Sequence, residues 1–173
     1  MPVIKMWQIK RGLAKALERA SDPQLTGGGL WISVNAAVID PSNIAAIVQQ
    51  FGETVQSVGV TRPRTNSVAA HHLIQSFDPA VPVPLEVVHR VGVQLAERVT
   101  GGEHEYVVAT HVAASPVCNH IIFNPVSFES GRRFRVGRGT IGLIRTVSDE
   151  LYEAEGLPVL SRRADGSSSG VAL

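Results

Sequence analysis

The stretch of residues 110–124 constrains the possible folds of this chain more than any other part of it. An apolar run at residues 106–109 leads into this stretch, and a second apolar run, at residues 121–123, lies near its end. Residues 113–116, between the two runs, are small or polar and end in proline, which is typical of a turn. The pattern therefore predicts two antiparallel strands joined by a turn, with polar side chains where one strand ends and the next begins.

Three potential metal ligands would meet beside this turn. Side chains alternate between the two faces of a strand, so Cys118 and His120 point the same way, and Asn124 continues that face. Antiparallel pairing would bring His111 level with Cys118 and His120. Two imidazoles and a thiolate suit zinc or another thiophilic ion, and three ligands leave one coordination position open. The same pattern also fits a protein core with a small apolar cysteine and hydrogen-bonded histidines.

The motifs of this region resemble those of one known family. The chain reads Thr110-His111-Val112-Ala113 and then Cys118-Asn119-His120-Ile121-Ile122-Phe123-Asn124. This is similar to Thr-His-x-Asp followed by His-x-His-x-x-x-Asn in the relaxase or mobilisation-nuclease domain, an HUH-type single-strand endonuclease. The similarity extends over roughly the first 160 residues in the same order. The further segments that carry it are residues 4–7, 22–23, 30–35, 72–77, 88–92, 124–128 and 131–134.

The pattern and the resemblance both indicate an α+β fold. The apolar periodicity predicts an antiparallel sheet packed against helices, with central strands at residues 68–77, 105–112 and 117–124. The resemblance implies a five-stranded antiparallel sheet with the site on its exposed face. We expect Asp40 or Ser42 to cap the second helix, and residues 52–67 to form an exposed loop or hairpin. The other expected elements are strands at 3–9 and 30–34 and helices at 13–20, 85–99 and 140–155.

The resemblance also implies a divalent metal site. Its ligands would be His111, Cys118 and His120, with Cys118 in the place of a usual histidine. The metal would be manganese, magnesium or zinc. His72, which aligns with the family's histidine before Gln-Ser-Phe, and Asn124 would lie near the site. His72 would either orient the DNA or the metal-bound phosphate, or be a structural histidine bonded to a backbone carbonyl.

Two further differences from the family concern the chemistry of the site. Ala113 stands where an aspartate usually orients the first histidine, so a ligand-orienting carboxylate is missing. Arg19 stands where the family has the tyrosine that attacks the DNA phosphate, and a guanidinium cannot act as that nucleophile. The only tyrosines are Tyr106 and Tyr152, and Tyr106 would be the first to test as a substitute. The sequence leaves open whether the chain is an active enzyme.

Contacts with DNA would have to come from local clusters of positive charge, because the formal net charge is only +1. Residues 129–138 hold four arginines around Phe134, which would offer a stacking face to an unpaired base. These arginines are Arg132, Arg133, Arg135 and Arg138. We predict that this segment binds DNA, although it also fits a hairpin edge protected by charge. Arg62 and Arg64 would offer two further phosphate contacts from an exposed loop.

The composition is that of one domain. For the 173 residues we expect a relaxase-like domain at 1–160 and a disordered tail at 161–173, which is rich in serine and glycine. A single cysteine excludes an internal disulfide. The sequence shows neither a signal peptide nor an apolar run long enough to span a membrane. We therefore expect a soluble, cytoplasmic protein.

The leading hypothesis is a relaxase-family domain for the mobilisation of a plasmid or integrative element. It would bind single-stranded or transfer-origin DNA, with relaxosome accessory proteins as further partners. If active, it would nick that DNA by metal-assisted transesterification. The alternative is a catalytically inactive remnant that acts as a DNA-binding or protein-interaction module. A third interpretation, hydrolysis by a metal-activated water, lacks an obvious general base.

Overall fold

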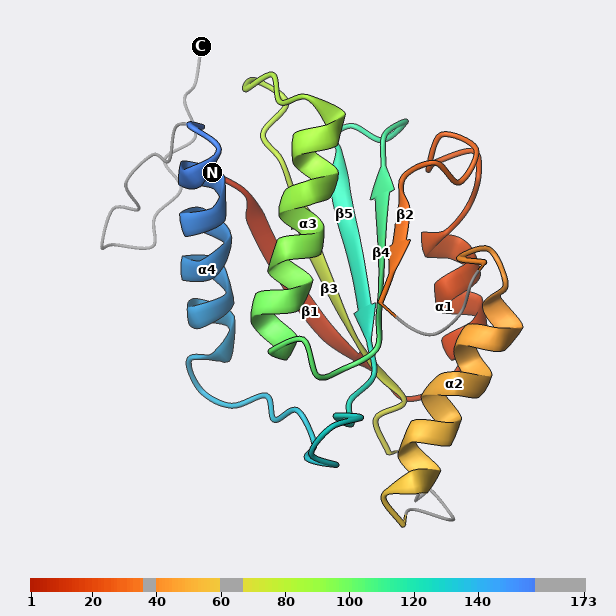
Figure 1. Ribbon diagram of the computed structural model, residues 1–173. Helices are drawn as coiled ribbons and strands as arrows, with labels where there is room; N and C mark the ends of the chain where they lie inside the picture. Colours follow the sequence, from red (N-terminus) through yellow and green to blue (C-terminus); the bar gives the residue numbers. More distant parts are fainter. Residues whose placement is uncertain (36–39, 60–66, 158–173) are drawn as a thin grey trace.

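The computed structural model describes residues 1–35, 40–59 and 67–157, which form one five-stranded antiparallel sheet and four helices (Figure 1). The strand order across the sheet is β1-β3-β5-β4-β2. The strands are β1 (Val3–Ile9), β2 (Ile32–Val34), β3 (Ala70–Ser76), β4 (Tyr106–His111) and β5 (Cys118–Phe123). The helices are α1 (Leu13–Ala20), α2 (Ile44–Ser57), α3 (Leu85–Thr100) and α4 (Thr140–Ala154). The predicted α+β fold is confirmed, with β3, β5 and β4 at the centre of the sheet.

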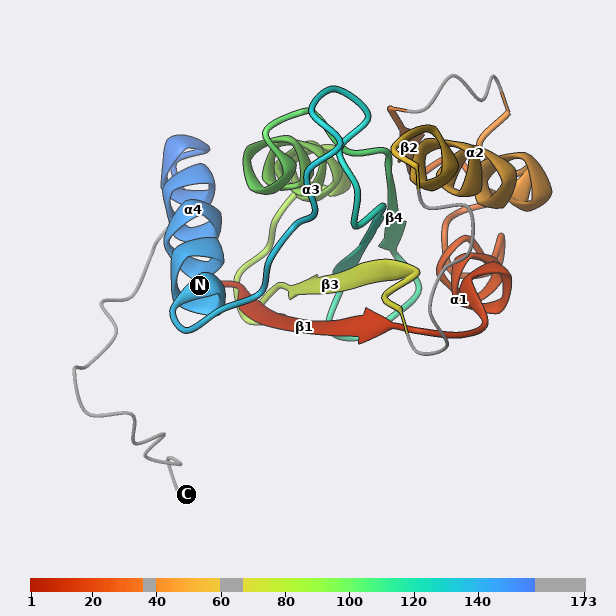
Figure 2. The same cartoon turned by 90° about the horizontal axis from the view of Figure 1, so that it is seen from below.

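Helices cover both faces of the sheet (Figure 2). α3 and α4 lie on one face, where Leu73, Ile121 and Phe123 are fully buried. α1 and α2 lie on the opposite face, against Val107 and Ile122. Each strand of the centre therefore buries side chains on both faces, which explains why its sequence is apolar at consecutive positions.

The layer of α1 and α2 covers only part of its sheet face. It reaches the end of β1 at Ile9, whereas Val3 and Trp7 of the same strand are 55% and 43% exposed. In Figure 2, none of the four helices lies over the outer side of β1. We call this uncovered part of the sheet face the open strip. It consists of Val3, Lys5 and Trp7 of β1 and the half-buried Ile74 and Ser76 of β3.

The N-cap of α2 differs from the prediction. Asn43 is the N-cap, and its side-chain oxygen accepts a hydrogen bond from the backbone N–H of Ala46 at 3.0 Å. Asp40 instead accepts a bond from the backbone N–H of Ser42 at 2.9 Å, which closes a turn before the helix. Aspartate, serine and asparagine are all good N-caps, so composition alone could not choose between neighbouring positions.

Residues 52–57, which were predicted to lie in a loop, continue α2 as far as Ser57. Glycine in a helix interior costs about 1 kcal/mol relative to alanine, and Gly52 stands in the interior of α2. The burial of Phe51 and Thr54 on either side of Gly52 offsets that cost. Arg62, Arg64 and the predicted tail at 161–173 lie outside the described residues.

The other element boundaries agree with the prediction to within two residues. No helix in the described part of the chain has both the length and the apolar character that crossing a membrane requires.

Candidate metal centre

Three predicted ligands come together where β4 ends and β5 begins. His111 pairs with Cys118 across the two strands, and His120 follows on the same face of β5. One ligand atom from each side chain, a ring nitrogen or the sulphur, lies within 4.8 Å of the other two. His120 is level with Ile74 of β3, so the cluster adjoins the open strip. In the described part of the chain, no other group of three histidine, cysteine or acidic side chains approaches as closely.

The ring of His111 is held by the backbone at the end of α1. Its Nε2 lies 2.8 Å from the carbonyl oxygen of Ala20. A carbonyl oxygen can only accept a hydrogen bond, so Nε2 carries the proton and Nδ1 keeps a lone pair for a metal. The Ala20 carbonyl therefore supplies the orienting contact that an aspartate at position 113 would otherwise make. Ala113 itself is exposed.

His120 is oriented by a second histidine. Its Nε2 lies 3.5 Å from the sulphur of Cys118, and its Nδ1 lies 3.0 Å from Nε2 of His72. If Nε2 is directed at a metal, Nδ1 carries the proton and donates a hydrogen bond to Nε2 of His72. Burial, with His111 and His72 nearby, lowers the pKa of His120 to about 3. Burial, with His111 nearby, lowers the pKa of His72 to about 4, so both rings are neutral near pH 7.

The donor set fits a thiophilic divalent metal. Neutral imidazoles offer the lone pairs that coordination requires. Burial raises the pKa of the Cys118 thiol, which would lose its proton when a metal binds. Two imidazoles and one thiolate suit zinc better than magnesium, because magnesium prefers oxygen ligands.

A row of buried, hydrogen-bonded polar side chains crosses strands β4, β5 and β3 on the face opposite to the metal cluster. Thr110 Oγ1 donates to Asn119 Oδ1 at 2.6 Å, and Asn119 Nδ2 donates to Gln75 Oε1 at 2.9 Å. Gln75 Nε2 in turn donates to Ser148 Oγ of α4 at 2.8 Å. We call these four residues the polar ladder. Asn119 lies between the two β5 ligands in the sequence, so the ladder fixes the strands that carry the metal cluster.

His89 of α3 extends the polar ladder. Its Nδ1 lies 2.7 Å from Thr110 Oγ1, and its Nε2 lies 2.8 Å from Ser33 Oγ of β2. The apolar stripe of α3 shows which face packs on the sheet but not which polar atoms lie beneath it. The available signal was the occurrence of Thr110, Asn119 and Gln75 in three strands that are predicted to be central.

Asn124, predicted near the site, lies away from the cluster. It follows β5, and its distance from His120 along an extended strand is about 13 Å. Its amide donates to Glu105 Oε2 at 2.9 Å and to the carbonyl oxygen of Phe51 at 3.1 Å. Asn124 therefore joins the end of β5 to α2. The alternation rule placed it on the correct face but says nothing about distance along the strand.

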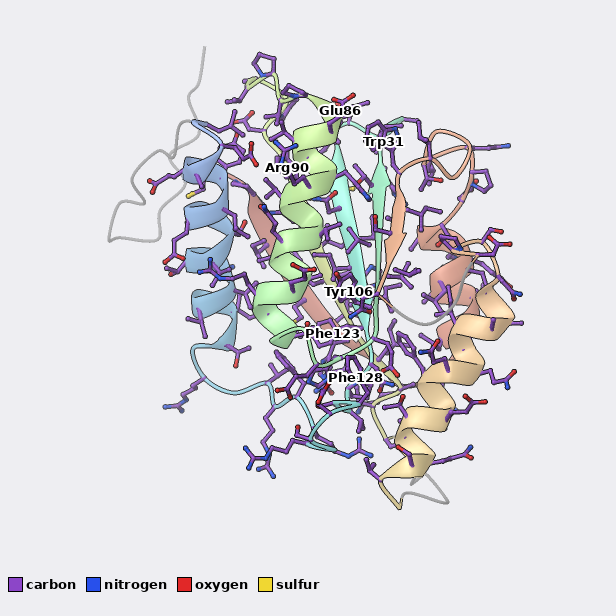
Figure 3. The ribbon with its side chains drawn as sticks, in the orientation of Figure 1. Trp31, Glu86, Arg90, Tyr106, Phe123 and Phe128 are labelled. Carbon is purple, nitrogen blue, oxygen red and sulfur yellow. The ribbon has the colours of Figure 1, made fainter. Side chains whose placement is uncertain are left out.

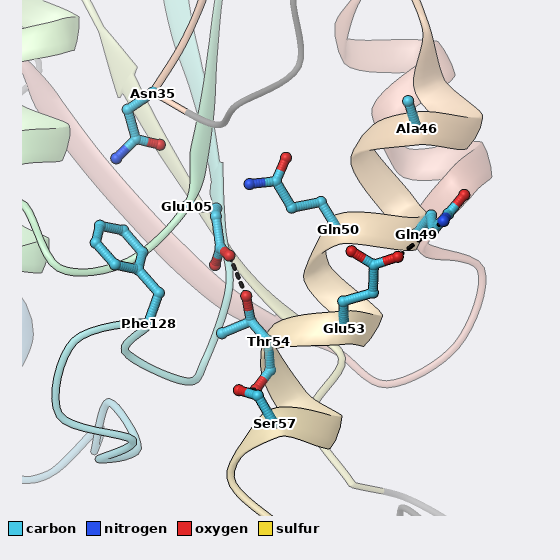
Figure 4. A pocket seen from close by; sticks show the side chains of 9 residues that line it. All are labelled: Asn35, Ala46, Gln49, Gln50, Glu53, Thr54, Ser57, Glu105 and Phe128. Atoms are coloured by element: carbon cyan, nitrogen blue, oxygen red, sulfur yellow. Dashed lines mark hydrogen bonds between the residues drawn. The ribbon is translucent and has the colours of Figure 1, made fainter.

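The buried Glu105 borders a separate hollow of about 700 Å³ near the start of β4 (Figure 4). Thr54 donates a hydrogen bond to Glu105, and Gln50, Glu53 and Phe128 also line the hollow. The carboxylates of Glu53 and Glu105 would repel a phosphate, so this hollow is a poor candidate for binding a DNA backbone.

The predicted DNA-binding arginines lie at the other end of the sheet from the metal cluster, beyond the end of β5 (Figure 1). All four side chains are exposed; they are Arg132, Arg133, Arg135 and Arg138. Arg133 lines a hollow of about 490 Å³ together with Lys10 and Arg11. Phe134, which was predicted to offer a stacking face, is half-buried. Its ring packs edge to face against Phe123, with centroids 5.0 Å apart, at the margin of the core.

Comparison with known proteins identifies the family. Residues 29–157, most of the chain, match the family described as Relaxase, MobA/VirD2-like, nuclease domain. The chain belongs to the relaxase family. The resemblance seen in its motifs is thereby confirmed.

Three relatives illustrate how far the similarity to other relaxases extends. The chain is 45% identical over 71 residues to the group II intron-interrupted relaxase LtrB of Lactococcus lactis, a match that covers 41% of this chain and 13% of LtrB. It is 30% identical over 99 residues to protein rlx of Staphylococcus aureus, covering 57% of this chain and 31% of rlx. It therefore spans less than a third of either relative. The MobM relaxase domain, solved with manganese and plasmid pMV158 oriT DNA, shares the fold, with a TM-score of 0.68 at 13% identity over 99% of this chain and 96% of that domain.

Arg19 is the residue that the resemblance in the sequence places at the position of the family's nucleophile. Arg19 lies in the last turn of α1 and is exposed. The next residue, Ala20, binds the ring of His111 through its carbonyl oxygen. The end of α1 is therefore in direct contact with the metal cluster, and the residue before this contact is the cationic Arg19.

Neither tyrosine of the relaxase lies where it could replace that nucleophile. Tyr106 lies beneath α3, on the face of the sheet opposite to the cluster, and its hydroxyl donates to Glu97 at 3.3 Å (Figure 3). Burial, with Glu97 nearby, raises the pKa of Tyr106 further above its usual range. Tyr152 belongs to α4 and is fully buried. The suggestion that Tyr106 could act as a substitute nucleophile is therefore wrong.

Proposed function

We propose that this relaxase domain binds single-stranded DNA of a transfer origin, holds one phosphate at the cluster of His111, Cys118 and His120, and does not cut it. One observation carries the proposal. The three ligands converge beside an open part of the sheet, while the end of the adjoining helix carries Arg19. In this proposal the domain keeps the side chains that would bind a phosphate but lacks the tyrosine that would attack it.

The side chains around the cluster have distinct parts in this function. When bound, a divalent metal would polarise the phosphate and offset its negative charge. The Ala20 carbonyl holds His111 in the tautomer that leaves Nδ1 free for coordination, and the hydrogen bond with His72 orients the ring of His120. The guanidinium of Arg19 would bind phosphate oxygens through paired hydrogen bonds, which stabilises the uncut strand.

The four exposed arginines of residues 132–138 remain the predicted phosphate contacts at the far end of the sheet. Binding should be measured by fluorescence anisotropy with a labelled single-stranded oligonucleotide pool of random sequence, against the corresponding duplex. We expect preference for the single strand and a steep loss of affinity with salt, because each phosphate contact releases counterions. Arg133→Ala should reduce the slope of log affinity against log salt by about 1.

Equal or absent binding of both DNA forms would contradict the proposal. It would favour the second candidate, a protein-interaction module that contacts accessory proteins of the relaxosome. The formal net charge of +1 is the observation that keeps this candidate in view, because it gives no general attraction to nucleic acid.

The loss of cutting can be tested by restoring a tyrosine. Arg19→Tyr would place a phenol at the end of α1, next to the residue that binds His111. With zinc or manganese added, we expect Arg19→Tyr, but neither the parent protein nor the control Arg19→Phe, to give a protein-linked DNA band on a denaturing gel. A protein-linked or free cut product from the parent protein would show that the chemistry is retained.

A further inference from the structure

An exposed tryptophan lies beside the metal cluster on the same face of the sheet. Side chains alternate along β1, and Ile4 and Met6 pack into the core beneath α3 and α4. Lys5 and Trp7 therefore point to the opposite face, which is the face of His120. In the register of the sheet, Lys5 pairs with Ile74, which pairs with His120.

A continuous row of rings connects Trp7 to the metal ligands. Trp7 pairs with His72 across β1 and β3, and their ring centroids lie 4.3 Å apart with an interplanar angle of 51°. His72 in turn hydrogen-bonds His120 at 3.0 Å. His72 is only 8% exposed, whereas 43% of Trp7 is exposed. The indole thus covers His72 with one side and presents the other to solvent.

We propose that Trp7 is the stacking platform for the nucleobase next to the phosphate held at the metal cluster, and that Lys5 contacts the phosphate backbone beside it. This inference rests on the proposed function and assigns a subsite within it. An aromatic face binds any unpaired base, and single-strand binding surfaces combine such faces with cations. Lys5 is exposed, and among the five residues of the open strip it is the cation that can meet DNA.

The same edge of the sheet indicates the path of the bound DNA strand. β1 runs from Lys5 past Trp7 to Ile9, and Lys10 and Arg11 follow directly. Both line the hollow that also contains Arg133. A single strand that leaves the metal cluster along β1 would therefore pass Lys5 and then Trp7 before it meets the cations at the far end of the sheet.

Tryptophan fluorescence tests the stacking contact directly, because the chain contains two tryptophans. Trp31→Phe leaves Trp7 as the only tryptophan, and Trp7→Phe leaves Trp31. Upon addition of the random single-stranded pool, we expect the emission of Trp31→Phe to be quenched and that of Trp7→Phe to stay unchanged. Binding of DNA by Trp31→Phe without quenching would overturn the inference and leave the proposed function intact. Absence of DNA binding by the parent protein would overturn the proposed function as well.

Affinity measurements separate stacking from structural support of His72. Trp7→Leu keeps an apolar cover over His72 but removes the aromatic face, and it should weaken single-strand binding roughly five- to 150-fold. Trp7→Phe should retain most of the affinity. Leu143→Ala, which truncates an exposed apolar side chain on α4, is the matched control and should bind like the parent.

An oligonucleotide with one abasic position supplies the decisive comparison. Starting from one sequence selected from the pool, the abasic position is moved along the strand. At one position, removal of the base should lower the affinity of the parent by the same factor as the substitution Trp7→Leu does. Removal of that base should hardly change the affinity of the Trp7→Leu variant. Additive losses at every position would show that Trp7 contacts no base. Thermal melting of each variant confirms that it is folded, and the fluorescence test does not depend on Trp7→Leu.

Discussion

At the scale of single residues, the metal cluster depends on groups that are not ligands. The carbonyl oxygen of Ala20 sets the tautomer of His111, and the ring of His72 orients His120 through a hydrogen bond. Contacts of this kind fix the orientation of the imidazole ring. Their loss typically lowers metal affinity by about 10–100-fold. Ala113 therefore need not be an aspartate for His111 to be oriented, because the carbonyl oxygen of Ala20 makes the orienting contact.

Cys118 should decide which metal binds. With cobalt as a spectroscopic probe, we expect the parent protein to show a sulphur-to-metal charge-transfer band in the near ultraviolet. Cys118→Ser should lose this band and weaken zinc binding by more than about 100-fold, because even non-ligand partners account for about 10–100-fold. Cys118→His should bind metal without the band. A cobalt complex of the parent without the band would show that Cys118 is not a ligand.

The sequence predicted the three ligands but not their supports. Alternation along β5 and pairing across the turn are local rules, and they sufficed to bring His111, Cys118 and His120 together. The contact between His111 and Ala20 joins residues 91 positions apart, and nothing in the local pattern indicates it. Trp7 escaped notice for the same reason, since its neighbour His72 lies on another strand.

At the scale of elements, the polar ladder requires α3 to approach β5 closely. Gly92 of α3 allows this approach, because a Cβ at that position would lie 2.4 Å from Nδ2 of Asn119 and 2.6 Å from its Cγ. Asn119 is fully buried, and its Nδ2 already donates to Gln75 and to the carbonyl oxygen of Val88. A side chain at position 92 must therefore displace Asn119, which lies between the two β5 ligands.

Gly92→Ala should destabilise the fold by about 1–3 kcal/mol, through overpacking and loss of ladder hydrogen bonds, as measured by urea unfolding. It should also weaken zinc binding, because the strand that carries both ligands shifts. Gly142→Ala in α4 is the matched control. Nothing lies within 4 Å of a Cβ there, so the substitution should stabilise the fold by roughly 0.5–1 kcal/mol. Unchanged stability of Gly92→Ala would show that α3 can move away without cost.

The order of elements was predictable, and their caps and ends were less so. The apolar stripes of α3 and α4 and the apolar strands gave those elements to within two residues. The end of α2 was not predicted correctly, because the burial of Phe51 and Thr54 outweighs the helix-weakening effect of Gly52. Phe134 illustrates the same limit: its arginine-rich surroundings suggested a surface residue, but its ring packs on Phe123.

At the scale of the whole molecule, the fold contains several buried histidines whose protonation it resists. His71, on the face of the sheet beneath α3 and α4, is 1% exposed and stacks on Phe123 with ring centroids 5.1 Å apart. Burial, with His104 nearby, lowers the pKa of His71 to about 4, although a hydrogen bond with the backbone of Phe134 acts in the opposite direction. Burial also lowers the pKa of His104. Neither ring belongs to the metal cluster, so their effect is on stability.

The unfolding free energy should therefore fall as the pH falls from about 6.5 to about 4, the range between the ordinary pKa of a histidine and that of His71 in the fold. Within this range the unfolded chain binds a proton that the folded His71 does not, so protonation favours unfolding. His71→Phe removes this group and keeps a ring against Phe123. Urea unfolding in the presence of a chelator should show the parent losing up to roughly 3 kcal/mol more than His71→Phe between pH 7 and pH 4. Parallel pH profiles for the two proteins would show that His71 is protonated as easily in the fold as in the unfolded chain.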